Sequence, residues 1–151
     1  MTTNSPNKAP IYPIEPIKWR KKLNNQIVAR EVTTETPILL GTAGINGSLI
    51  DAIEVLHLGD NVGTTLRFYT QKTDDVDTEN NSLYYLEIEQ SLNVVSASTN
   101  ATAIPKVNIE LPAILPSPQK GLRLTPGEKI YCALGTAIVS GVIVKVSGGN
   151  Y

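Results

Sequence analysis

The chain is short of the residue types on which most site chemistry depends. Among its 151 residues it has one cysteine and one histidine, and aromatic residues make up 5%. A single cysteine excludes an internal disulfide and a cysteine-based zinc site, and a single histidine excludes a metal site with several histidine ligands. The sequence therefore predicts no metal site and no cofactor.

Long hydrophobic runs are also lacking. No window approaches the run of about 20 apolar residues that a membrane helix requires. Proline and charged residues interrupt the N-terminus, which lacks the apolar core of a signal peptide. Hydrophobic residues still make up 41% of the chain, too many for a wholly disordered protein. We expect one folded domain, made in the cytoplasm and without membrane contact.

The small net charge hides an uneven distribution. Residues 1–30 contain six bases and one acid, a charge of +5, whereas residues 31–151 contain seven bases and thirteen acids, a charge of -6. A net charge of -1 argues against a uniformly basic nucleic-acid-binding protein. The pattern indicates a basic N-terminal segment on an acidic body.

The N-terminal segment, residues 1–25, is rich in proline and also in large apolar residues. Proline cannot donate a hydrogen bond to a helix or sheet, and it favours extended backbone before it. We predict an extended arm that lies in a groove on another subunit; a disordered tail is the alternative. The residues expected to bind the partner are Ile11, Tyr12, Pro13, Ile14, Pro16, Ile17, Trp19, Arg20, Lys21 and Lys22.

From residue 26 to residue 151 the pattern is that of short strands. Apolar and polar residues alternate, and Gly, Pro, Asn and Asp separate the segments. The expected strands are 26–34, 37–40, 48–58, 64–71, 83–90, 106–111, 129–134 and 140–147. Each has one apolar face, so two sheets must pack together to bury them. We predict an all-β chain that forms a single antiparallel β-sandwich, jelly-roll-like, with about eight strands and the N-terminal arm.

The search for catalytic residues favours a protein that is not an enzyme. His57 has no nucleophile motif near it, and a hydrolytic triad needs a nucleophile and an acid as well as a histidine. Cys132 falls on the apolar face of its strand, where a buried thiol is the usual outcome. An enzyme remains the third hypothesis, which loss of turnover on substituting His57 would support.

Three further segments resemble sites only in part. Residues 74–80 are acidic enough to suggest calcium, but they lack the glycine and terminal glutamate of an EF-hand loop, so we predict a solvated hairpin tip. Residues 41–47 are rich in glycine, but a strand pattern follows them instead of the helix of a phosphate-binding loop, so we predict a turn. Residues 18–22 form a basic patch with one tryptophan, suited to phosphate or to an acidic protein surface.

Several short motifs occur in a recognisable order. Gly-x-Asn-Gly-Ser at residues 44–48 leads into a long strand, Thr-Leu-Arg-Phe-Tyr follows at 65–69, Leu-x-Leu-x-Pro-Gly-Glu stands at 122–128, and the chain ends on Ser-Gly-Gly-Asn-Tyr. Over residues 38–151 this resembles small β-sandwich virion proteins of tailed bacteriophages. The ending Asn150-Tyr151 departs from the more common Asp-Phe of that group.

The resemblance implies a structural role without catalysis. It suggests a capsid decoration, or cement, protein on the outside of the virion, bound to the shell of major capsid protein and binding no specific nucleic acid. We expect a homo-oligomer and favour a trimer, with a dimer as the alternative. The second hypothesis is a tail fibre, adaptor or baseplate component that binds host glycans through Tyr69, Tyr85 and Tyr131, which fall opposite the predicted core.

Overall fold

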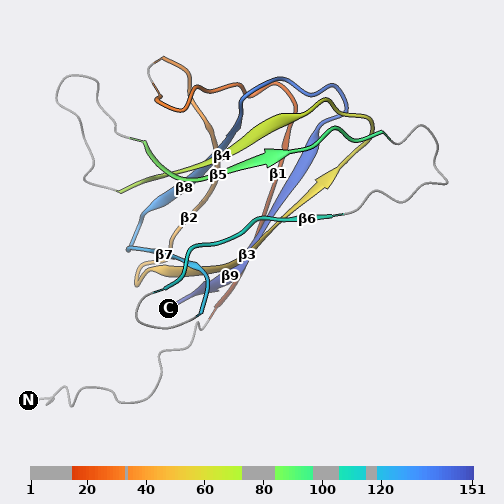
Figure 1. Cartoon of the computed structure of the whole chain (residues 1–151). Helices are drawn as coiled ribbons and strands as arrows, with labels where there is room; N and C mark the ends of the chain where they lie inside the picture. Colours follow the sequence, from red (N-terminus) through yellow and green to blue (C-terminus); the bar gives the residue numbers. More distant parts are fainter. Residues whose placement is uncertain (1–14, 33, 73–83, 97–105, 115–118) are drawn as a thin grey trace, which may run out of the picture.

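Strands make up all the regular structure that the computed structural model describes. It describes residues 15–32, 34–72, 84–96, 106–114 and 119–151, and within these ranges nine strands form two antiparallel sheets without a helix (Figure 1). The expectation of an all-β sandwich is confirmed. Since the described residues contain no helix, they also contain none that is long and apolar enough to span a membrane.

The first sheet contains both ends of the described chain. Its strands are β1 (Glu15–Leu23), β3 (Ser48–His57), β6 (Val107–Asn108), β7 (Leu122–Leu124) and β9 (Val142–Asn150). Their order is β1-β9-β3-β6. β7 pairs with the same edge of β3 as β6 does, but β7 lies at the start of β3 and β6 lies near its end. Glu15 lies opposite Asn150, so residues 1–14 join the sandwich at the end that holds the C-terminus.

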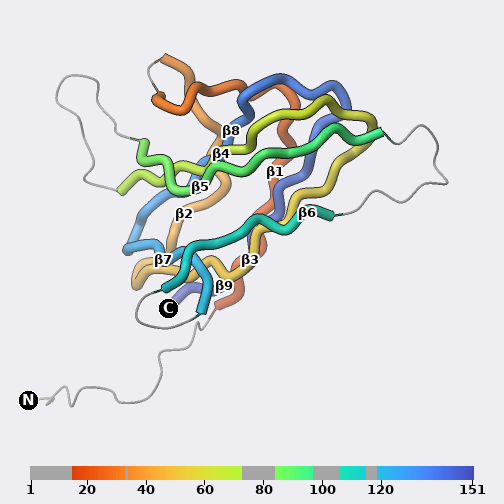
Figure 2. The backbone as a smooth tube through the Cα atoms, viewed as in Figure 1, coloured from red at the N-terminus to blue at the C-terminus, as the bar shows by residue number. Residues whose placement is uncertain are grey.

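The second sheet packs against the first. It consists of β2 (Ile38–Thr42), β4 (Thr64–Gln71), β5 (Tyr85–Leu92) and β8 (Lys129–Leu134), in the order β2-β8-β4-β5. The path of the backbone in Figure 2 passes repeatedly from one sheet to the other.

The connections are those of a jelly roll. Strands pair in a nested series, β1 with β9, β2 with β8, β3 with β6 and β4 with β5, as in one long hairpin that is folded over on itself. Alternate members of the series belong to different sheets. This is the double-sheet arrangement of jelly rolls, with β7 as a short addition.

The core lies between the sheets and follows the period-2 pattern of the sequence. On β9, Val142, Val144 and Val146 are fully buried, and on β4 the residues Leu66 and Phe68 face them from the other sheet. Burial of one such side chain contributes about 1.5–3 kcal/mol. This core holds the two sheets at a fixed separation, so the outward faces are rigid platforms.

The structure corrects the expected boundary between arm and sandwich. Residues 15–23 form β1, which pairs along its full length with β9, so the sandwich begins at Glu15 and not at residue 26. Ile17 and Leu23 are buried in the core. Pro16 is compatible with this strand because it lies near the start of an edge strand, where the hydrogen bond that proline cannot donate destabilises the sheet least.

Other expected strands need smaller corrections. The described residues of the range 26–34 do not form the expected strand; apart from one bridge at Ile27 they are irregular. The strand expected at 106–111 is reduced to β6, and β7 was not expected at all. The acidic residues 74–80 lie outside the described residues.

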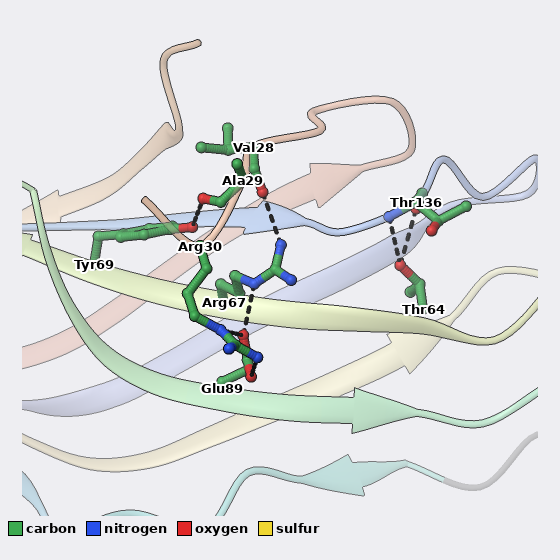
Figure 3. Close-up of polar contacts among 8 residues, drawn as sticks. All are labelled: Val28, Ala29, Arg30, Thr64, Arg67, Tyr69, Glu89 and Thr136. Atoms are coloured by element: carbon green, nitrogen blue, oxygen red, sulfur yellow. Dashed lines mark hydrogen bonds and ion pairs between the residues drawn. The ribbon is translucent and has the colours of Figure 1, made fainter. Parts of the chain in front are cut away.

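The predicted strand 26–34 is replaced by a segment that crosses the outer face of the second sheet. Val28 is fully buried there, together with Tyr69, Tyr131 and Ala133, in a second, smaller apolar cluster. Arg67 Nη1 donates a hydrogen bond to the Val28 carbonyl at 2.8 Å, and Tyr69 Oη donates one to the Ala29 carbonyl at 2.7 Å (Figure 3). We call residues 26–32 the crossing segment.

Candidate interaction surface

The basic residues of β1 occupy the outward face of the first sheet. Successive residues of a strand point to opposite sides, and Lys18, Arg20 and Lys22 alternate with the inward positions of Ile17 and Leu23. All three are exposed. The pairing of β1 with β9 therefore turns a basic stretch of sequence into a row of charges on a rigid face.

Next to this row the outward face forms a shallow groove. Its volume is about 240 Å³, and its lining comes from β1, β9 and β3 together with the residue before β6. The lining residues are Arg20, Glu54, Leu56, Lys106, Ile143 and Lys145. Ile143 and Leu56 lie opposite each other on adjacent strands and form an apolar floor between charged groups.

Positive charge dominates this surface, which we call the basic face and define by Lys18, Arg20, Lys22, Lys106 and Lys145. Within the groove the only carboxylate is that of Glu54, whose Oε2 lies 3.8 Å from Lys145 Nζ. Asp51 is exposed in the bulge of β3 on the same sheet. Among the described residues, no carboxylate lies within 4.0 Å of the other four cations. Their charge is available to a partner.

Comparison with known proteins gives no relative. No protein-family model, no curated protein and no solved structure matches the chain. The surface must therefore be interpreted from its own geometry.

Apart from Trp19, the expected partner-binding residues of the arm fall into three groups. Ile11, Tyr12, Pro13 and Ile14 lie outside the described residues. Ile17 is 3% exposed and packs in the core of its own chain, so a partner cannot reach it. Pro16, Arg20, Lys21 and Lys22 are exposed on β1, of which Arg20 and Lys22 belong to the basic face.

Trp19 does not serve as an exposed anchor. It is half-buried and packs against the main core. A Cβ atom added to Gly41 of β2 would overlap its indole ring, so the ring lies directly on the backbone of the other sheet. The only tryptophan of the chain therefore closes the edge of the sandwich between β1 and β2.

His57 and Cys132, the only histidine and the only cysteine of the chain, are both buried inside the sandwich. His57 is 3% exposed, and its Nδ1 lies 3.1 Å from the side-chain amide Nδ2 of Asn61. Asn61 Oδ1 accepts a hydrogen bond from the Ser140 N–H, and Nδ2 also donates to the Gly141 carbonyl. His57 Nδ1 is therefore an acceptor, and burial lowers the pKa of the ring. Cys132 is fully buried, and desolvation strongly raises the pKa of its thiol.

The aromatic residues proposed for glycan binding are mostly covered. Tyr69 is fully buried and Tyr131 is 8% exposed, because the crossing segment and Tyr84 lie over them. Burial raises the pKa of both hydroxyl groups. Of the three tyrosines only Tyr85 is exposed. The expectation that this face offers a set of aromatic side chains to a sugar is wrong.

The first and the last of the short sequence motifs, residues 44–48 and 147–151, meet in one junction. Ser48 Oγ accepts from the Gly44 N–H at 3.0 Å and donates to Asn150 Oδ1 at 2.5 Å, while the Tyr151 N–H donates to the Gly47 carbonyl at 3.1 Å. Gly47 has a φ of 92°, which favours glycine. The turn expected at residues 41–47 is confirmed at its second half, and the motif has a structural role.

Of the groove residues, only Arg20 is among the binding residues predicted from the sequence. The other five are Glu54, Leu56, Lys106, Ile143 and Lys145, and they come from three segments that only the sheet brings together. The alternation of the strands predicts that Ile143 and Lys145 share a face, but it does not predict which strand lies beside them. The pairing of β9 with both β1 and β3 supplies that information.

Proposed function

We propose that this chain is a non-enzymatic structural protein of a tailed-phage virion, a capsid decoration protein that binds and stabilises the shell of major capsid protein. The order of short motifs supports the assignment to virions. The jelly roll is compatible with it, since this fold occurs in viral capsid proteins, but also in lectins and cupins.

The structural observation that supports an attachment role is the basic face. It is a sheet surface with four cations that lack a partner among the described residues, and it includes a groove with an apolar floor. Residues 1–14, which include Ile11, Tyr12, Pro13 and Ile14, continue directly into the same edge strand. In the proposed arrangement, the basic face rests on the shell and residues 1–14 reach neighbouring subunits.

A symmetric oligomer suits a shell, which repeats its binding sites by symmetry. We favour a homotrimer, located on the capsid exterior, with a dimer as the alternative. Sedimentation equilibrium of the purified chain distinguishes these assemblies from a monomer.

The test of this function is a cryo-EM map of the particle, combined with immunogold labelling. Density for the sandwich on the head, at a fixed position on every capsomer, is the expected result. Labelling of the tail alone would replace the decoration role with the tail-component hypothesis. Absence of the chain from purified particles would overturn both.

A further inference from the structure

We propose that the basic face binds an acidic protein segment, with one apolar side chain of that segment inserted over Leu56 and Ile143 and its flanking carboxylates paired with Arg20 and Lys106. This inference deepens the proposed function by naming the chemistry of the partner, and it rests on that function only for the identity of the partner as a capsid subunit.

The floor of the groove supports the apolar part of this proposal. Leu56 and Ile143 are cross-strand neighbours, half-buried, and open to the groove. Specific protein interfaces combine an apolar centre with a polar rim. Here charged side chains surround the apolar pair, and an aliphatic side chain from a partner would cover it.

The charges around the floor support the acidic part. Arg20 borders the groove from β1 and Lys106 from the segment before β6, so carboxylates on both sides of an inserted apolar residue find a cation. Lys18 and Lys22 flank Arg20, each two residues along the same strand, which is a spacing of about 6.6 Å. Arginine suits carboxylates because its planar guanidinium donates two parallel hydrogen bonds.

The same surface is less suited to a nucleic acid. Proteins that bind single strands stack the bases on aromatic side chains, whereas the outward residues that line this groove are aliphatic or charged. Trp19 packs toward the core instead. An acidic protein segment therefore fits better than a phosphate backbone.

Peptide titration of the full chain tests the proposal. The probes are a short peptide with one leucine flanked by glutamates, the same peptide with serine in place of the leucine, and single-stranded and duplex DNA. Binding is followed by fluorescence anisotropy and by backbone amide shifts in NMR. We expect the leucine peptide to bind most tightly and to change the amide chemical shifts of Ile143 and Leu56. Its affinity should fall as salt is added.

Two variants and a matched control assign the binding to this surface. Arg20→Glu should lower the affinity for the leucine peptide about tenfold or more. Leu56→Ser should make the affinities for the leucine and serine peptides equal. Lys129→Glu makes the same charge change at an exposed position on the second sheet, and should leave binding nearly unchanged. Circular dichroism confirms that each variant is folded.

The proposal is overturned if DNA binds more tightly than the leucine peptide, if Arg20→Glu has no greater effect than Lys129→Glu, or if neither peptide binds. These outcomes are distinct from failure of the proposed function. A chain that decorates heads but ignores the peptide retains the function and loses this inference, whereas a chain that binds the peptide but is absent from particles does the reverse.

Discussion

At the scale of single residues, the indole ring of Trp19 packs directly on the backbone of Gly41. The contact joins the edge strands of the two sheets, and it leaves no room for even a methyl group on residue 41. The absence of a side chain at this position is therefore part of how the sandwich closes.

Gly41→Ala is expected to displace the indole. Overpacking of this kind costs about 1–3 kcal/mol. The chain has one tryptophan, so its fluorescence reports on this contact alone, and we expect a shift of the emission to longer wavelength together with a lower midpoint of urea unfolding. Gly63→Ala is the control, since its Cβ would meet the Leu92 carbonyl oxygen at 3.5 Å, an ordinary contact. Equal effects of the two changes would refute this explanation.

His57 makes the stability depend on pH. Burial lowers its pKa below the ordinary 6.5, so as pH falls below 6.5 the unfolded chain takes up a proton before the folded chain does. The stability that the neutral ring provides is present above that pH and is lost below it, by at most about 1.4 kcal/mol per pH unit.

His57→Gln is expected to flatten this part of the profile, because the amide oxygen can accept the hydrogen bond from Asn61 without titrating. Urea denaturation between pH 7.5 and pH 5, compared for the two proteins, measures the effect. Parallel profiles would show that His57 does not cause the dependence.

At the scale of elements, the crossing segment depends on Glu89 of β5. Glu89 accepts hydrogen bonds from Arg30 at 2.7 Å and from Arg67 at 2.7 Å, and Arg67 also binds the Val28 carbonyl (Figure 3). The hydrogen bond from Arg30 has the largest effect on the pKa of Glu89, and that from Arg67 the next largest; together they lower this pKa to about 2. Glu89 therefore connects β5 to a segment that lies over β4.

Glu89→Gln is expected to loosen the crossing segment at neutral pH. Because the folded pKa lies below the ordinary 4.5, the advantage of the wild type is present above pH 4.5 and is lost as pH falls toward 2. In that pH range, the wild-type rates of amide hydrogen exchange at Val28 to Arg30 should approach those of the variant. The wild-type unfolding midpoint should approach that of the variant as well. A difference that persists unchanged at pH 2 would contradict the assigned role.

The strands differ in how well their sequences predict them. The sequence predicts β3, β4, β5, β8 and β9 nearly in full, because apolar residues recur at every second position over much of each strand and turn residues separate the strands. The sequence predicts an arm in place of β1 because its outward positions are basic and Pro16 lies near its start, features that an edge strand tolerates. The crossing segment resembles a strand in its sequence because it is rich in β-branched residues, but Val28 and Val32 pack on the outside of a sheet and not in the core between the sheets.

The candidate surface was foreseen only in its β1 part. A basic stretch at residues 18–22 is visible in the sequence, whereas the groove beside it depends on which strands are neighbours. That order results from long-range pairing, β1 with β9 and β9 with β3, which local periodicity does not encode.

At the scale of the whole molecule, the nested pairing makes β1 an integral part of the folding unit. It closes one edge of the first sheet, contributes Ile17 and Leu23 to the core, and supplies most of the basic face. Residues 1–14 precede every strand that the structure describes. The folded unit that the structure describes therefore begins at Glu15.

Two truncations test this boundary. Deletion of residues 2–14 should leave the unfolding free energy within about 0.5 kcal/mol of the full chain, because no described core residue is lost. Deletion of residues 2–23 should cost several kcal/mol and prevent stable folding, because removal of a single buried Leu or Ile side chain already costs about 2–5 kcal/mol. Urea denaturation and near-ultraviolet circular dichroism measure both effects. If the longer deletion unfolds with the midpoint of the full chain, then β1 is dispensable and residues 15–23 act as an arm after all. If instead only the longer deletion unfolds, any assay of residues 1–14 as a partner-binding segment must keep β1 intact.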